Sequence, residues 1–230
     1  MNASRLKLLS FDVFGTLISV RESSYGAFAD ILKEAGASHI DVKAFWEYWE
    51  ERNIAHYWEP WRPYKQICRD SLAETFAHFG ITNGKVDSIQ HYFDAFDQFE
   101  LYPDVAATLE LFAKRFRLAI VSNIDDDLLA RTPLKRQFDL VCTAERARGY
   151  KPDGALFRYL LSTADCELDE ILHSGQSQFT DMVGAKPLGL TVAWINRRGI
   201  ALSPEVPKPD FIYPDIQSLL PLVMPHERPG

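Results

Sequence analysis

Short apolar segments alternate with amphipathic helical patterns through the second half of the chain, and this alternation constrains the fold more than any other feature. Helical patterns at 104–116 and 153–164 lie between such segments. Short strands rich in β-branched residues, separated by helices, indicate a parallel sheet covered on both faces. The pattern therefore predicts an α/β fold with a doubly wound parallel sheet. After a first strand at 6–11, the predicted strands are 117–123, 140–143, 171–175 and 190–196.

The region between the first predicted strand and residue 100 has a different pattern, with helical spacing throughout and no convincing strand. Its apolar residues recur on one helix face, and glycines end two of the stretches. We expect a core of residues 1–16 and 100–230, with a helical cap, 17–99, inserted after the first strand. Residues 204–230 are rich in proline and are expected to wrap the surface. The predicted cap helices are 24–35, 42–58, 64–79 and 86–96.

Composition limits the classes of function. A chain of 230 residues with 47% hydrophobic content can bury one sizeable core. Its net charge of -7 argues against nucleic acid or an anionic membrane as the primary partner. No apolar run approaches the length of a membrane span, and three scattered cysteines without CxxC spacing do not form a complete disulfide framework. We expect a soluble, cytoplasmic protein, either a monomer or a homodimer.

Polar residues follow the predicted strands at the points where those strands end. Ligands of an open parallel sheet bind beyond the carboxyl ends of the strands, because loops and helix N-termini converge there. These side chains are therefore expected to share one cleft. Taken singly, Asp12 could merely cap a turn and Lys151 could form a structural ion pair, but the ordered set favours a site. The set is Asp12, Thr16, Ser122, Asn123, Lys151, Gln176, Ser177 and Asp181.

Four ordered segments, SFDVFGTL, AIVSN, GYKPD and SGQSQFTDMVGAK, resemble the motifs of the haloacid dehalogenase superfamily of hydrolases. The resemblance implies a Rossmann-like core with an inserted cap, and it implies that Asp12 is a nucleophile that forms a covalent ester. It further implies that Ser122 binds the substrate's anionic group and that Lys151 stabilises the charge of Asp12. Asp181 would position or activate the hydrolytic water.

Two departures distinguish the chain from the magnesium-dependent phosphatases of that superfamily. Phe14 stands where the phosphatases carry an aspartate that protonates the leaving group, and an apolar ring cannot donate a proton. Gln176 replaces an acidic residue that helps to hold magnesium, and a neutral amide weakens such a site. Both departures resemble the metal-free type II 2-haloacid dehalogenases. No metal or other cofactor is expected, and Mg²⁺ is disfavoured.

The resemblance to type II dehalogenases has gaps in the cap. The arginine that follows a tryptophan there is replaced by glutamate in FWEYWEERN, which leaves Arg52 and Arg62 as alternatives, and a tyrosine of the family is Phe157 here. Another relative in this branch, azetidine-2-carboxylate hydrolase, opens a strained ring, and aromatic and acidic cap residues suit an ammonium group. The predicted substrate is a small 2-substituted carboxylic acid that loses halide or a ring nitrogen.

Substrate contacts are expected from Val13 and Phe14 of the first motif and from Trp46 and Trp49 of the cap, besides the polar set. Two other classes of function stay open at this point. One is a magnesium-dependent phosphomonoesterase of the same superfamily. The other is a binding protein that kept the fold and lost catalysis, although the complete set of Asp12, Ser122, Lys151 and Asp181 makes this unattractive.

Overall fold

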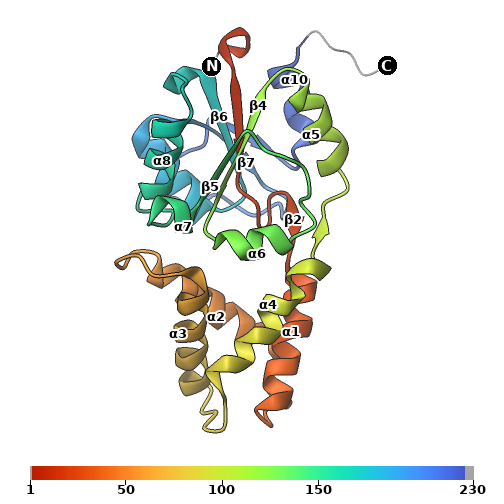
Figure 1. Ribbon diagram of the computed structural model, residues 1–230, viewed down its shortest axis with the longest axis vertical. Helices are drawn as coiled ribbons and strands as arrows, with labels where there is room; N and C mark the ends of the chain where they lie inside the picture. The colour runs from red at the N-terminus through yellow and green to blue at the C-terminus, as the bar shows by residue number, and fades with distance from the viewer. Residues whose placement is uncertain (1, 226–230) are drawn as a thin grey trace.

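The computed structural model describes residues 2–225, and a six-stranded parallel sheet lies at its centre. The order of the strands is β5-β4-β1-β6-β7-β8. Figure 1 shows α5 and α10 on one side of this sheet and α7 and α8 on the other. The predicted doubly wound α/β fold is therefore confirmed. The strands are β1 (Leu8–Phe11), β4 (Arg117–Ser122), β5 (Leu140–Thr143), β6 (Ile171–Gly175), β7 (Thr191–Ile195) and β8 (Phe211–Tyr213).

The first strand, β1, lies in the middle of the sheet. Leu8 is in register with Arg117 of β4 on one side and with Ile171 of β6 on the other. All four residues of β1 are buried, because strands of a parallel sheet are covered on both faces. The residue that follows β1, Asp12, is thereby placed at the centre of the carboxyl edge of the sheet.

The helices of this core are short. The structure gives them at α5 (Val105–Ala113), α6 (Asp126–Arg131), α7 (Ala144–Ala147), α8 (Ala155–Thr163), α9 (Val183–Ala185) and α10 (Leu220–Val223). Strand β8 was not predicted, since three residues flanked by prolines carry no periodic signal. Part of the predicted surface wrap is thus an edge strand and a short helix, and residues 226–230 lie outside the described part of the chain.

A group of helices lies beyond the carboxyl edge of the sheet (Figure 1). Two short strands, β2 (Ile18–Ser19) and β3 (Glu100–Leu101), pair antiparallel where the chain enters and leaves this helical group. The helix predicted at 86–96 is instead two 3₁₀ turns, η2 (Val86–Ile89) and η3 (Ala95–Gln98), on either side of a short α-helix. The helices of the group are α1 (Arg21–Glu34), α2 (Val42–His56), α3 (Tyr64–His78) and α4 (Gln90–Asp94).

Aromatic rings from several helices form the interior of the helical group. Trp49 of α2 lies 4.8 Å from Phe28 of α1 and 5.0 Å from Tyr92 of α4, measured between ring centroids. Tyr92 in turn lies 5.2 Å from Phe96. Edge-to-face and tilted contacts at these separations are favourable for aromatic pairs. They hold α1, α2 and α4 together, so much of the aromatic content of this region serves packing.

The cysteines do not form disulfides. Cys68 and Cys142 are buried and Cys166 is partly buried, and each is a free thiol. Free thiols are expected in a reducing compartment. They do not test the cytoplasmic location, which stays a prediction. Within residues 2–225, the helices lack the combination of length and apolar character that crossing a bilayer requires.

Candidate active site

One ammonium group is shared by two carboxylates at the carboxyl edge of the sheet. Lys151 Nζ lies 2.8 Å from Asp12 Oδ1 and 2.7 Å from Asp181 Oδ1. It also donates a hydrogen bond of 2.9 Å to the carbonyl of Val121 in β4. Both Lys151 and Asp181 are inaccessible to solvent, and Asp12 is 7% exposed. The structure thus brings together three of the predicted residues from three different segments.

Asp12 is held by the turn that follows β1. Its backbone NH donates to the carbonyl of Ser174 in β6. Thr16 Oγ1 donates a hydrogen bond of 2.7 Å to Asp12 Oδ2 and accepts one of 2.9 Å from the backbone NH of Gln176. Gly15 has a backbone φ of 80°, a conformation that residues other than glycine rarely adopt. The Gly-Thr pair therefore turns the chain and directs a hydroxyl onto the carboxylate.

Lys151 is fixed through its main chain by Asn123. The Asn123 side-chain oxygen accepts from the Lys151 NH at 2.8 Å, and its side-chain NH₂ donates to the Lys151 carbonyl at 2.8 Å. This pairing links the end of β4 to the loop before α8. Asn123 was predicted as a substrate contact, but both ends of its amide are engaged by Lys151. Its position favours a role in holding the lysine.

Asp181 belongs to a π-helical turn, η5 (Gln178–Met182), which follows β6. Its Oδ2 accepts a hydrogen bond of 3.0 Å from the backbone NH of Ser177, and its Oδ1 lies 3.3 Å from His173 Nε2. His173 Nδ1 in turn lies 3.0 Å from Ser10 Oγ in β1. Both oxygens of Asp181 are therefore occupied by protein partners. π-Helical turns are frequent at functional sites because they redirect a side chain within a helix.

The charges of this cluster are strongly coupled. Burial raises the pKa of Asp12 above its ordinary value, and the neighbouring Lys151 opposes that shift. Burial would also raise the pKa of Asp181, but Lys151 and His173 together lower it to about 2. Burial by itself lowers the pKa of Lys151, and the two carboxylates reverse this and raise it. At neutral pH, Lys151 is therefore a cation and Asp181 an anion.

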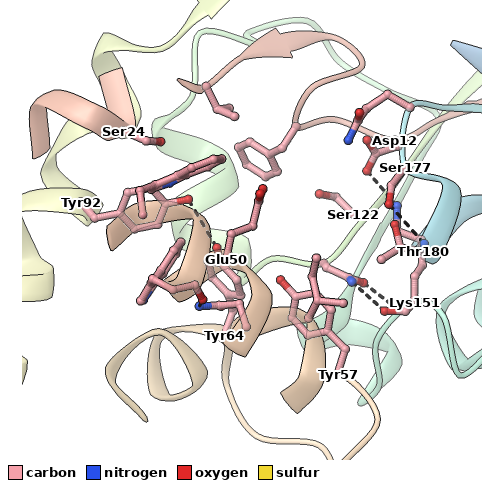
Figure 2. Close-up of a pocket in the computed structure, with 18 residues that line it drawn as sticks. Asp12, Ser24, Glu50, Tyr57, Tyr64, Tyr92, Ser122, Lys151, Ser177 and Thr180 are labelled. Carbon is pink, nitrogen blue, oxygen red and sulfur yellow. Dashed lines mark hydrogen bonds and ion pairs between the residues drawn. The ribbon is translucent and has the colours of Figure 1, made fainter. Parts of the chain in front are cut away.

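A cavity of about 130 Å³ lies between this cluster and the helical group. Figure 2 shows Asp12, Lys151 and Ser122 on one side of the pocket and Tyr64 and Tyr92 on the other. Ser122 Oγ is buried and has no hydrogen-bond partner among the described residues. The predicted residues that line the cavity are Asp12, Phe14, Trp46, Trp49, Ser122, Asn123, Lys151, Gln176 and Ser177.

Three predicted residues do not line this cavity. Thr16 and Asp181 lie behind it and contact Asp12 and Lys151. Val13 is fully buried, and its carbonyl accepts hydrogen bonds from Thr16, Leu17 and Ile18 within the turn. The buried position of Val13 does not support its predicted contact with substrate.

Comparisons with known proteins identify the family. The family model described as "Haloacid dehalogenase-like hydrolase" matches residues 9–195. The chain belongs to the haloacid dehalogenase-like hydrolase family. The family that the four sequence motifs predicted is thereby confirmed, and the protein is a hydrolase.

Individual relatives agree with this family assignment. Haloacetate dehalogenase H-2 of Moraxella sp. (strain B) is 22% identical over 95% of this chain and 98% of its own. Haloacid dehalogenase-like hydrolase domain-containing protein 3 of Bos taurus is 30% identical over 66% of this chain and 65% of its own. The L-2-haloacid dehalogenase structure from Xanthobacter autotrophicus with chloropropionic acid covalently bound has a TM-score of 0.79 and 22% identity, covering 96% of this chain and 100% of the other.

The residues present in this hydrolase do not form a convincing magnesium site. Within residues 2–225, no group of three or more His, Cys, Asp or Glu side chains is arranged to hold a metal ion. The Lys151 ammonium bridges Asp12 and Asp181, the two carboxylates that a cation would need. Gln176 contributes a neutral amide, and Mg²⁺ prefers anionic oxygen ligands.

The arginines suggested for the hydrolase's cap lie elsewhere. Arg52 pairs with Glu74, and Arg62 pairs with Glu59 and Asp70. Neither arginine lines the cavity, and in the described chain no other arginine does. These positions therefore do not support either alternative for the family's cap arginine, because acidic residues outside the cavity hold both guanidinium groups.

Sequence reasoning missed most of the cavity wall that the helical group provides. Trp46, Glu50, Asn53 and Tyr57 lie three or four residues apart along α2 and its C-terminal end, so they share one face of the helix. That spacing could have indicated a helix face that lines the cavity. However, aromatic residues at helical spacing more often pack inside a protein than bind a ligand. The cavity-lining residues that were not predicted are Val20, Ser24, Glu50, Asn53, Ile54, Tyr57, Tyr64, Tyr92 and Thr180.

Proposed function

We propose that this hydrolase acts without a metal ion and that Asp12 attacks an sp³ carbon of a small 2-substituted carboxylic acid, which forms a covalent ester. One observation carries the proposal. Asp12 is paired with Lys151 at the wall of a small cavity, and the aromatic ring of Phe14 lines the same cavity where a phosphatase needs a proton donor.

In the first step, a carboxylate oxygen of Asp12 forms a bond to carbon while the leaving group departs with the bonding electrons. A halide leaves as a stable anion and needs no proton, which suits a site with Phe14 in this place. Lys151 keeps Asp12 ionised, because an adjacent cation favours the charged form of a carboxyl group. Burial keeps water away from the carboxylate and strengthens its electrostatic interactions.

In the second step, water adds to the carbonyl carbon of the ester and the bond between the ester carbon and the substrate oxygen breaks. Asp12 is regenerated with one oxygen from water, the product carries a hydroxyl group, and the remaining proton passes to solvent. The resemblance implied that Asp181 positions or activates the hydrolytic water. Because both of its oxygens are engaged and it is buried, we assign it the positioning of Lys151 instead.

Two leaving groups are consistent with this mechanism. Halide is supported by relatives whose names include haloacetate dehalogenase and by the structure with covalently bound chloropropionic acid. A strained ring nitrogen is supported by the aromatic wall of the cavity and by Glu50 within it. A cavity of about 130 Å³ suits an acid of a few carbon atoms in either case.

Oxygen-18 labelling tests the covalent step. A single turnover in oxygen-18 water, with enzyme in excess, should place the label in the peptide that carries Asp12 and leave the product unlabelled. The peptide that carries Asp181 serves as the internal control and should stay unlabelled. Label in the product and none in Asp12 would mean that water attacks the substrate directly, which rejects the proposal.

A substrate panel tests the metal and the reaction class. The panel contains 2-haloacids, azetidine-2-carboxylate and p-nitrophenyl phosphate, each assayed with and without EDTA. We expect turnover of a 2-substituted acid that EDTA leaves unchanged. The phosphomonoesterase alternative instead requires hydrolysis of p-nitrophenyl phosphate that EDTA abolishes.

A further inference from the structure

Glu50 introduces a third carboxylate to the cavity, opposite the Asp12 cluster. It lies on α2 and, together with Trp46 and Trp49, lines the cavity of about 130 Å³ beside Asp12, here called the inner cavity. In Figure 2 its side chain extends into the middle of the pocket and faces Ser122. It also lines a second cavity of about 330 Å³, here called the outer cavity, which shares Phe14 and Trp46 with the inner one and is also lined by the exposed residues Phe179 and Ile200.

No partner within the protein neutralises Glu50 by direct contact. Among residues 2–225, no side chain or backbone NH donates a hydrogen bond to it, and no ion pair includes it. Burial raises its pKa, while the positive charges of Arg21 and Arg198 at the outer cavity oppose that shift only through space. Glu50 is partly buried, and a carboxylate that is partly withdrawn from water without a partner favours a ligand that supplies a positive charge.

The charge balance of the inner cavity leads to the same conclusion. Its charged lining residues are Asp12, Glu50 and Lys151, and the single ammonium group is already shared with Asp181 behind the wall. A substrate that carried only a carboxylate would therefore enter a cavity of net negative charge. Ser122, whose hydroxyl has no protein partner, can donate to that carboxylate but adds no charge.

The surroundings of Glu50 also suit a cation. Trp49 and Tyr92 line the same cavity, and aromatic rings attract ammonium groups through the negative potential of their faces. The Trp46 ring, which also lines the cavity, already has the Arg21 guanidinium over it at 5.4 Å from the ring centroid. A zwitterion fits such a cavity, with its carboxylate toward Ser122 and its nitrogen toward Glu50. Arg21 and Arg198 at the outer cavity would still attract the carboxylate of a substrate during its approach.

We propose that Glu50 binds a cationic nitrogen of the substrate, so that the hydrolase selects small zwitterionic amino acids over simple carboxylates. This inference rests on the proposed function, because it takes the cavity beside Asp12 as the place where substrate binds. Glu50 acts here as a specificity-determining residue. In the proposed reaction it neither attacks the substrate nor transfers a proton.

A pair of ligands of equal ring size tests this selectivity. Azetidine-2-carboxylate carries a cationic ring nitrogen at pH 7, and cyclobutanecarboxylate carries a methylene group in its place. Their dissociation constants are measured by titration calorimetry in an Asp12→Asn parent, which prevents turnover. The same titrations are made after Glu50→Gln and, as a matched control, after Glu51→Gln, since Glu51 is the next residue on α2, is exposed and lines neither cavity.

The parent should bind the azetidine at least about tenfold more tightly than the cyclobutane, because one charge-assisted hydrogen bond has this effect. Glu50→Gln should bring the ratio close to one, and Glu51→Gln should leave it unchanged. A parent that binds both ligands equally, or neither, overturns the inference even if Glu50→Gln fails to fold. An unchanged ratio in Glu50→Gln overturns it as well. Binding is measured without chemistry, so these results are independent of the oxygen-18 result for Asp12.

Discussion

At the scale of single residues, the site depends on one lysine that lies between two buried carboxylates. Removal of its amine would leave Asp12 and Asp181 as like charges without a cation, and a buried charge that loses its partner is strongly destabilising. The same change would favour protonation of Asp12 and so remove the proposed nucleophile. Stability and activity are therefore expected to fall together.

Replacement of Lys151 tests this coupling. Lys151→Met should abolish turnover and lower the free energy of unfolding by about 3–5 kcal/mol, as measured by urea denaturation. Lys186→Met is the matched control, because Lys186 pairs with Asp210 near the surface, with side chains 21% and 37% exposed. The control should lose at most about 1 kcal/mol and keep its activity. Equal stability of the two variants would contradict a buried three-residue charge cluster.

The pKa of Asp12 has a direct consequence for the pH dependence of activity. In the proposed mechanism Asp12 attacks only when ionised, and burial raises its pKa above the ordinary value of 3.8, so the acid limb of kcat/KM should lie above pH 3.8. Asp181, with a pKa of about 2, stays ionised across this range. Glu50 also has a raised pKa, so the limb should fit one proton in a Glu50→Gln background, where kcat/KM is measured with circular dichroism as a check on folding. An acid limb at or below pH 3.8 would contradict the raised pKa.

At the scale of elements, the junction between β6 and η5 determines where Asp181 lies. Gly175 ends β6, and a Cβ atom at this position would overlap the Asp181 carboxylate. The glycine is needed here for space rather than for an unusual backbone conformation. The strand end and the π-helical turn together bring the carboxylate back onto Lys151.

Gly175→Ala should therefore displace Asp181. We expect kcat to fall about a hundredfold, since small misplacements of catalytic groups have effects of this size. Stability should fall by ~1–3 kcal/mol from overpacking. Gly26→Ala in α1 is the control, because nothing lies within 4 Å of its added Cβ, and it should keep kcat and gain up to about 1 kcal/mol. If the two variants had the same kcat, Asp181 would not need this space.

At the scale of the whole molecule, Asp125 connects the core to the helical group. Asp125 precedes α6, at a position where an acidic side chain commonly caps the helix that follows. Instead, the Asp125 side chain accepts hydrogen bonds of 2.8 Å and 3.0 Å from the backbone NH groups of Tyr64 and Lys65, at the start of α3. Asp125 therefore caps α3 rather than α6, because a helix distant in sequence presents its unsatisfied NH groups to this carboxylate.

Loss of this contact should loosen α3, which contributes Tyr64 to the cavity wall. Asp125→Ala should lower stability by about 1–2 kcal/mol, as loss of a helix cap does, and should speed hydrogen exchange in α3 more than in the central strands. Asp127→Ala removes only an exposed ion pair to Lys65 and should change stability by less than about 1 kcal/mol. Equal exchange rates of α3 in both variants would show that the cap does not hold the helix.

The sequence by itself determined the class of fold and which charged residues meet at the edge of the sheet. Periodicity is local, so it identified the strands and most of the helices. Strand ends of a parallel sheet converge, so Asp12, Lys151 and Asp181 could be placed together before any coordinates were known. The motifs added the family, which comparison confirmed.

Only the tertiary structure decided what faces Asp12 across the cavity. Glu50 and Tyr92 lie on different helices of the inserted group, and their approach to the sheet edge depends on how those helices pack. The same packing turned Asp125 toward α3 and held Arg52 and Arg62 in outer ion pairs. Contacts between segments far apart in the chain have no local signature, because side-chain spacing defines a helix face but not the surface that this face meets.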